Sequence, residues 1–183
     1  MQNTISESTI KANNKEEEKI MFREMRRNKQ LLSKTDMEVV MSRCTNGVMA
    51  CIGDGNYPYA VPVNFVYYKG GIYFHSAKEG HKVDAIGRNP KVSFAVIDED
   101  KIVSSEYTSY FRSVIAFGKA RIVEGSERQE AFWALVEKYS ADQPEEAKQK
   151  IVARCTQACI IAIDIEHMTG KEAKEFVNAK NSG

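Results

Sequence analysis

Residues 57–82 decide the fold, and they read YPYAVPVNFVYYKGGIYFHSAKEGHK. The stretch is rich in β-branched and aromatic residues, which favour strands. Lys69-Gly70-Gly71 is typical of a hairpin turn between two such strands, here predicted at residues 57–68 and 72–75. Proline cannot donate a hydrogen bond to a sheet ladder, so Pro58 and Pro62 indicate an edge strand or a bulge. A short helix follows, and we expect it to end before Pro90.

The same kind of pattern extends in both directions along the chain. Two capping boxes, Thr35 with Glu38 and Ser126 with Gln129, predict the starts of two further helices. Residues 98–108 are polar and weakly patterned, and we expect a loop there. The remaining predictions are strands at residues 48–52, 91–97, 113–124 and 158–165, and helices at about 35–44, 126–139 and 144–154.

These elements predict the fold class. About six strands, joined mostly by hairpins and accompanied by few helices, do not match the regular alternation of a doubly wound sheet. We therefore expect a mainly β fold with peripheral helices, built on a Greek-key-like, six-stranded antiparallel barrel. The domain is expected to span residues 19–175, with a flexible charged arm at 1–18 and a charged tail at 176–183.

The composition excludes several classes of function. The chain has 183 residues and a mass of 20.6 kDa, which favours one medium-sized domain. Its net charge of +1 gives no basic footprint for nucleic acid, and no apolar run approaches the ~18 residues of a membrane span. No secretory signal is evident, and the cysteines have no zinc-ligand spacing. We therefore expect a cytoplasmic protein with no metal site and no nucleic-acid or membrane partner.

The segment from Tyr73 to Lys82 is the best candidate for ligand binding, because it leaves a strand, turns at Gly80 and enters a helix. The start of a helix offers free backbone N–H groups and the positive end of the macrodipole, which favour an anion. Ser76 can donate a hydroxyl hydrogen bond, Lys82 a charge and His81 a second donor, a set that suits a phosphate group. The alternative is an ordinary loop with solvated side chains, and the spacing alone does not decide between the two.

Five motifs occur along residues 20–175 in a fixed order: Tyr57–Phe65, His75–Lys82, Arg88-Asn89-Pro90 followed by an apolar strand, Ser113–Ala120, and Thr169-Gly170-Lys171. In this order the motifs resemble those of the pyridoxamine 5′-phosphate oxidase-related, FMN-binding split-barrel proteins, and most closely the 5-nitroimidazole resistance (Nim) type. The resemblance implies a split β-barrel, FMN as the cofactor, and a homodimer with the flavin at its interface.

The resemblance also implies which residues form the site. A strand with Ala60, Val61, Pro62, Val63 and Asn64 would run along the isoalloxazine ring, and His75 and Ser76 would end the neighbouring strand beside the cofactor. His81 and Lys82 at the helix start would hold the phosphate. A third strand, with Arg112, Ser113 and Val114, would approach the ring. The better-known oxidases carry an arginine where this chain has His81, and a histidine is charged only part of the time near neutral pH.

His75 is the candidate catalytic residue, because the matching histidine of the Nim type is associated with activity near the flavin. It could donate a proton to a nitro group under reduction or orient a ligand. The alternative role, closing the barrel end through bonds to backbone, stays open. The resemblance implies an FMN-dependent oxidoreductase that reduces a small acceptor such as a nitroaromatic. A non-catalytic carrier or sensor of flavin or haem is the alternative from another functional class.

Overall fold

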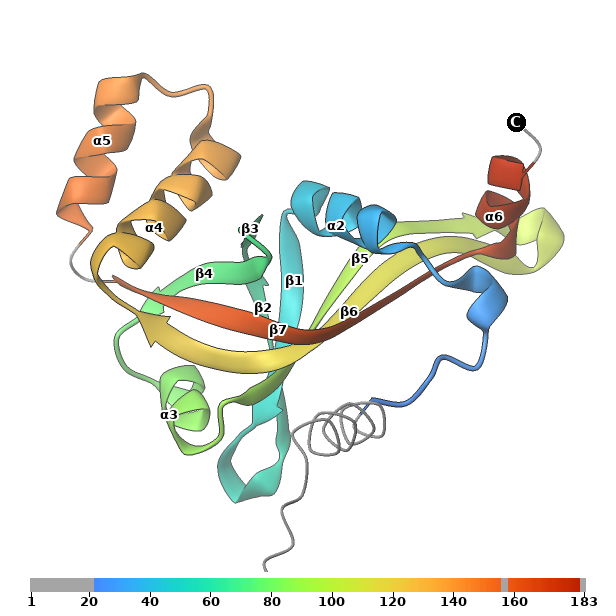
Figure 1. The fold of residues 1–183 in the computed structure, drawn as a ribbon, viewed down its shortest axis with the longest axis horizontal. Coiled ribbons are helices and arrows are strands. Elements are labelled where there is room, and N and C mark those ends of the chain that lie inside the picture. Colours follow the sequence, from blue (N-terminus) through green and yellow to red (C-terminus); the bar gives the residue numbers. More distant parts are fainter. Residues whose placement is uncertain (1–21, 156–157, 182–183) are drawn as a thin grey trace, which may run out of the picture.

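The computed structural model describes residues 22–155 and 158–181 (Figure 1). The arm expected at residues 1–18 lies outside these ranges. The strands are β1 (Asn46–Ile52), β2 (Pro58–Asn64), β3 (Val66–Tyr68), β4 (Gly71–Ala77), β5 (Lys91–Val103), β6 (Thr108–Val123) and β7 (Ala158–Glu172). The α-helices are α2 (Lys34–Arg43), α3 (His81–Arg88), α4 (Gly125–Ser140), α5 (Glu145–Arg154) and α6 (Lys174–Asn181), and the 3-10 turns are η1 (Asn28–Gln30), η2 (Asp54–Asn56) and η3 (Ser104–Glu106).

The described strands form one antiparallel sheet in the order β2-β1-β5-β6-β7-β4-β3. The mainly β class with peripheral helices is confirmed, but the prediction of six strands was wrong, because the sheet has seven. The stretch predicted as one strand up to Tyr68 is divided at the fully buried Phe65. β2 pairs with β1 at one edge and β3 pairs with β4 at the other, so the sheet curls until its two edges meet at Phe65. Pro62 lies in the edge strand β2, as the sequence predicts.

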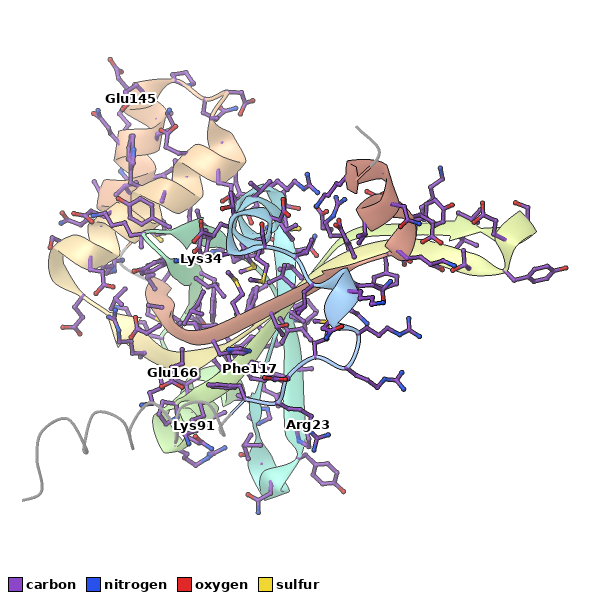
Figure 2. All side chains as sticks on the ribbon, turned by 45° about the vertical axis from the view of Figure 1, so that its right-hand side comes forward. Arg23, Lys34, Lys91, Phe117, Glu145 and Glu166 are labelled. Atoms are coloured by element: carbon purple, nitrogen blue, oxygen red, sulfur yellow. The ribbon has the colours of Figure 1, made fainter. Side chains whose placement is uncertain are left out.

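The loop predicted at residues 98–108 is also wrong. β5 and β6 continue their pairing as far as Val103 opposite Thr108, and the turn η3 joins them. This hairpin extends beyond the body of the sheet (Figure 2), and its residues from Asp100 to Thr108 are exposed or half-buried. A strand with no buried face has no apolar alternation, which explains why the sequence pattern gave no signal there.

Two hydrophobic cores hold the helices against the sheet. One core fills the inside of the curled sheet and is covered by α2 and α3, and it includes Phe74 of β4. The other lies between the opposite face of β4 and β7 and the helix α4, and it includes Tyr73. Neighbouring residues of a strand face opposite sides, so β4 contributes to both cores. α4 and α5 lie together at one end of the molecule, far from the β5–β6 hairpin and α6 (Figure 1).

The two helix starts differ from the predicted capping boxes. α2 is capped by Ser33, whose Oγ accepts the N–H of Asp36 at 3.1 Å, rather than by Thr35. Leu32 precedes this cap and Met37 follows it, at the two positions of a hydrophobic staple, and both are buried in the same core. Their burial favours a helix that starts after Ser33 rather than after Thr35. α4 begins at Gly125 with no side-chain cap. No helix in the described ranges is long and apolar enough to cross a membrane.

Candidate functional site

The chain between β4 and α3 leaves a helix start open to a ligand. Gly80 has φ 115°, a backbone conformation that favours glycine, and it allows the chain to turn sharply into α3. No side chain caps this helix. The N–H groups of its first residues, His81 and Lys82, therefore have no acceptor within the helix. They form a backbone site that suits an anion.

Two polar side chains next to this helix start have no partner. Ser76 is only 6% exposed, and its hydroxyl makes no hydrogen bond to a described residue. The Nζ atom of Lys82 lies 5.6 Å from the centroid of the Phe74 ring, with no ion pair in the described part of the chain, and burial lowers the pKa of this lysine. Phe74 and Ser76 lie on the same face of β4. Because both groups are hydrogen-bond donors with no described acceptor, they suit a bound phosphate.

The side chain of His81 is engaged elsewhere. Its ring stacks on Tyr59 with centroids 4.2 Å apart, and its Nε2 atom accepts the N–H of Asp54 at 3.3 Å. A Cβ atom on Gly53 would lie 2.8 Å from the same nitrogen, so the turn after β1 packs closely on the imidazole. Asp54 also accepts a hydrogen bond from Arg88 at 2.6 Å and thereby contacts both ends of α3. The Nε2 atom of His81 is therefore engaged by the turn after β1, whereas its backbone N–H at the helix start has no acceptor within the helix.

The predicted ring-binding strand is an open edge. Along β2, Ala60, Pro62 and Asn64 are exposed, whereas Val61 and Val63 pack against the inner core. β2 pairs only with β1, so its other edge has no strand partner in the described ranges. A flat ring can therefore lie along small side chains and unpaired backbone groups.

A second open edge lies close to this one. β3 covers β4 only as far as Tyr73, so His75 and Ser76 pair with β7 on one side and with no described strand on the other. β2 and β4 are close neighbours in space. The curled sheet is therefore split between these two strands, at the place where most of the predicted site residues lie.

His75 lies on the opposite face of β4 from Ser76. It is exposed, and it makes no hydrogen bond to a described residue, so the bonds to backbone expected of a purely structural histidine are not found there. His75 and Asn64 line a cavity of about 310 Å³ whose wall is α4. The structure thus brings His75 together with Asn64, whereas Ser76 and Lys82 lie on the other face of the strand.

Arg112, Ser113 and Val114 form a separate group. They lie in β6, which is separated from β2 by β1 and β5 in the sheet. Val114 is fully buried. The guanidinium of Arg112 donates to Glu172 at 3.0 Å and to Asp98 at 3.3 Å. Within one chain, the side chain of Arg112 is therefore held by internal carboxylates.

These two carboxylates belong to an ion-pair network that the sequence did not reveal. The side chains of Asp98 and Glu172 are 6% and 3% exposed, and Arg43 and Lys180 provide further partners. Burial by itself raises the pKa of Asp98, but hydrogen bonds from Arg43 and Arg112 outweigh it and hold that pKa below its ordinary value. The network joins α2, β5, β6, β7 and α6 around the base of the hairpin.

A second cavity adjoins the phosphate-binding candidates. Its volume is about 520 Å³, and its lining includes Lys78, Arg128 and Cys159. Cys159 pairs directly with Ser76 across β7 and β4. The cavity therefore lies near Ser76. Its lining carries Glu124 as well as the two cationic side chains, of which Arg128 already donates to the carbonyls of Cys155 and Ala158.

Known proteins share this architecture. Residues 33–172 match the family model described as pyridoxamine 5′-phosphate oxidase. A candidate 5-nitroimidazole antibiotic resistance protein from Bacteroides thetaiotaomicron is 24% identical, with a TM-score of 0.65 over 78% of this chain and 86% of that one. A conserved hypothetical protein from Mycobacterium tuberculosis is 20% identical, with a TM-score of 0.70 over 81% and 90%. The FAD and heme binding protein from Mycobacterium smegmatis is 18% identical, with a TM-score of 0.63 over 82% and 80%. No curated protein matches the sequence significantly.

At such low identities the structures show the fold alone, and together with the family match they confirm the predicted split barrel.

Proposed function

The chain belongs to the pyridoxamine 5′-phosphate oxidase family, and on this premise we propose that it is an FMN-dependent oxidoreductase that reduces a small nitroaromatic acceptor. The observation that carries the proposal is the pair of unpartnered polar groups, the Ser76 hydroxyl and the half-buried Lys82 ammonium, beside an uncapped helix start. A terminal phosphate would satisfy all of these donors at once.

The chain's residues would divide the work of holding the cofactor. Ser76, Lys82 and the N–H groups at the start of α3 would bind the phosphate, and the exposed edge from Ala60 to Asn64 would lie along the ring. The bound flavin supplies the reversible uptake and release of electron pairs. FAD is the second candidate, favoured by the cavity near Ser76, where the ammonium of Lys78 could bind a second phosphate.

The proposed reaction converts an aromatic nitro group to an amine. It consumes electrons and protons in equal number, breaks both N–O bonds and releases the oxygens as water, and a reduced pyridine nucleotide is the proposed outside reductant. His75 would donate a proton to a nitro oxygen, since its ring is exposed beside Asn64 and has no partner in the described chain. The likeness to a candidate 5-nitroimidazole resistance protein supports this choice of acceptor.

We also propose that two copies of the chain form the complete site. The register aligns Pro62, Val48, Ala95 and Ile115 in one row across the outer face of β2, β1, β5 and β6. Val48 is 39% exposed, Ile115 41% and the nearby Ile97 71%, and an apolar sheet face of this kind favours a protein partner. A second copy on this face could bring its own β6 toward the flavin ring. The free thiols of all four cysteines suit the reducing cytoplasm, the proposed location.

Spectra and turnover test the proposal. The purified protein should show flavin absorbance, should bind FMN more tightly than riboflavin, and should convert a 5-nitroimidazole to its amine under anaerobic conditions with a reduced pyridine nucleotide. A bound flavin that no reduced nucleotide bleaches would favour the carrier or sensor function, and a haem Soret band would favour haem. A colourless protein that takes up neither FMN nor FAD would contradict every flavin function.

A further inference from the structure

The cavity beside His75 has an apolar wall and a polar mouth. Its volume is about 310 Å³. Phe132 and Leu135 of α4 are almost fully buried, and with Val136 they form the wall. Asn64 at the end of β2 and His75 of β4, which are both exposed, line the side of the cavity formed by the sheet, which we call its mouth. The cavity therefore opens toward the split between β2 and β4, where the flavin is proposed to bind.

The wall is held rigidly. Tyr139 also lines the cavity. Its hydroxyl oxygen accepts a hydrogen bond from the backbone N–H of Phe65 at 2.9 Å. Its O–H group can donate to the carbonyl oxygen of Phe65, at 2.8 Å, or to that of Thr45. Its neighbour Lys138 donates to the carbonyl of Cys44 at 2.6 Å. The end of α4 is thus fixed to the residue that follows Asn64. A preformed cavity of this kind loses little entropy when it binds a ligand.

The lining also restricts the ligand's charge and size. No aspartate, glutamate, lysine or arginine of the described chain lines the cavity, so it favours a neutral ligand. Asn64 and His75 can each donate a hydrogen bond and have no partner among the described residues, which suits an oxygen acceptor on that ligand. Ligand pockets span roughly 300–1,000 Å³, so this cavity takes a single small ring and is too small for a pyridine dinucleotide.

We propose that this cavity is the acceptor pocket and that Val136 and Leu135 determine which acceptors it admits. The inference rests on the proposed function, which places a nitro oxygen at His75 but does not specify where the acceptor ring lies or what limits its size. A neutral heteroaromatic ring lies against the wall formed by α4, and its nitro oxygens lie at the mouth, between Asn64 and His75. Bulky ring substituents meet Val136 and are excluded.

The test uses the FMN-loaded protein and 2-methyl-5-nitroimidazole as the probe, with binding followed through the change in flavin absorbance. Val136→Trp fills the cavity and should weaken probe binding by about tenfold or more, while FMN affinity stays within about twofold of wild type. Gln129→Trp, at an exposed position of the same helix, is the matched control and should change neither. Val136→Ala enlarges the cavity and should admit probes with bulkier ring substituents that the wild type rejects, a gain that misfolding cannot produce.

Two results would overturn the inference. In the first, Val136→Trp binds the probe as tightly as wild type, and Val136→Ala accepts no bulkier probes. This result would place the acceptor elsewhere, while FMN binding and nitro reduction by wild type would still support the proposed function. Loss of FMN binding in Val136→Trp but not in Gln129→Trp would show that the cavity holds the flavin itself.

Discussion

Replacing Lys82 by methionine tests the phosphate site directly. The substitution removes the ammonium but keeps an unbranched apolar side chain over the Phe74 ring, where the Nζ atom now lies 5.6 Å from the centroid. A hydrogen bond to a charged group contributes about 1.5–3 kcal/mol. At about 1.4 kcal/mol per tenfold, FMN should bind about tenfold to 150-fold more weakly to Lys82→Met than to wild type.

The same substitution should stabilise the protein without cofactor. Burial lowers the pKa of Lys82, so the charged form is less favourable in the folded state than in the unfolded state. This cost is present at neutral pH and disappears as the pH rises through the lowered pKa toward the ordinary lysine value. Lys82→Met should therefore raise the midpoint of thermal unfolding of the apo protein at neutral pH, and this gain should shrink in alkaline buffer.

Flavin fluorescence titrations at neutral pH give the deciding comparison. Riboflavin lacks the phosphate, so its affinity should be almost the same in wild type and Lys82→Met. Lys78→Met removes a nearby lysine that lines the other cavity, and it should leave FMN binding intact while weakening FAD binding if FAD enters that cavity. Equal losses for FMN and riboflavin in Lys82→Met, or no loss for either, would refute the placement of the phosphate.

Three further outcomes are expected. Asp98→Asn leaves Arg43 and Arg112 without their shared carboxylate and should reduce the free energy of unfolding, measured in urea, by about 1.5–3 kcal/mol, because Arg43 is half exposed and Arg112 keeps Glu172. Because the folded pKa of Asp98 is lowered, wild type should lose this advantage only as the pH falls below the ordinary aspartate value, and a difference that persists in strong acid would contradict the ion pairs. Ile115→Asp places a charge on the exposed sheet face and should shift sedimentation from dimer to monomer, whereas an unchanged dimer would locate the interface elsewhere. His75→Gln should keep FMN bound but slow nitro reduction by about 100-fold or more. If the variant turned over as fast as wild type, His75 would not be the proton donor.

Local signals predicted much of the fold and marked one candidate ligand site. Pro62 predicted an edge strand because the ladder excludes proline, and β2 is an edge. Ser76 and Lys82 were predicted as candidate ligand-binding residues because a strand, a glycine and a helix start follow one another within a few residues, and the structure has these elements in that order. Phe65 gave no such signal, since a buried aromatic residue continues an apolar run whether the chain goes straight on or crosses to the other edge.

Features that depend on residues far apart in the sequence could not be predicted from local patterns. The ring orientation of His81 depends on Tyr59 in β2 and Asp54 in η2. The carboxylate that holds Arg112 comes from Glu172, in β7, and no local pattern links the two. The wall of the His75 cavity is built from α4, so its existence depends on how that helix packs on the sheet.

The split between β2 and β4 explains how two neighbouring residues can serve different ends of one ligand. His75 and Ser76 face opposite sides of β4, so no ligand confined to one face of the sheet can reach both. Beyond Tyr73, however, β4 has no described strand beside it on the side of β2. A flat ring that occupies this gap can hold its phosphate tail on the Ser76 side while its reactive edge faces His75. A shift of one residue in the pairing of Ser76 with Cys159 would exchange the two faces of β4. The proposed chemistry therefore depends on the register between β4 and β7.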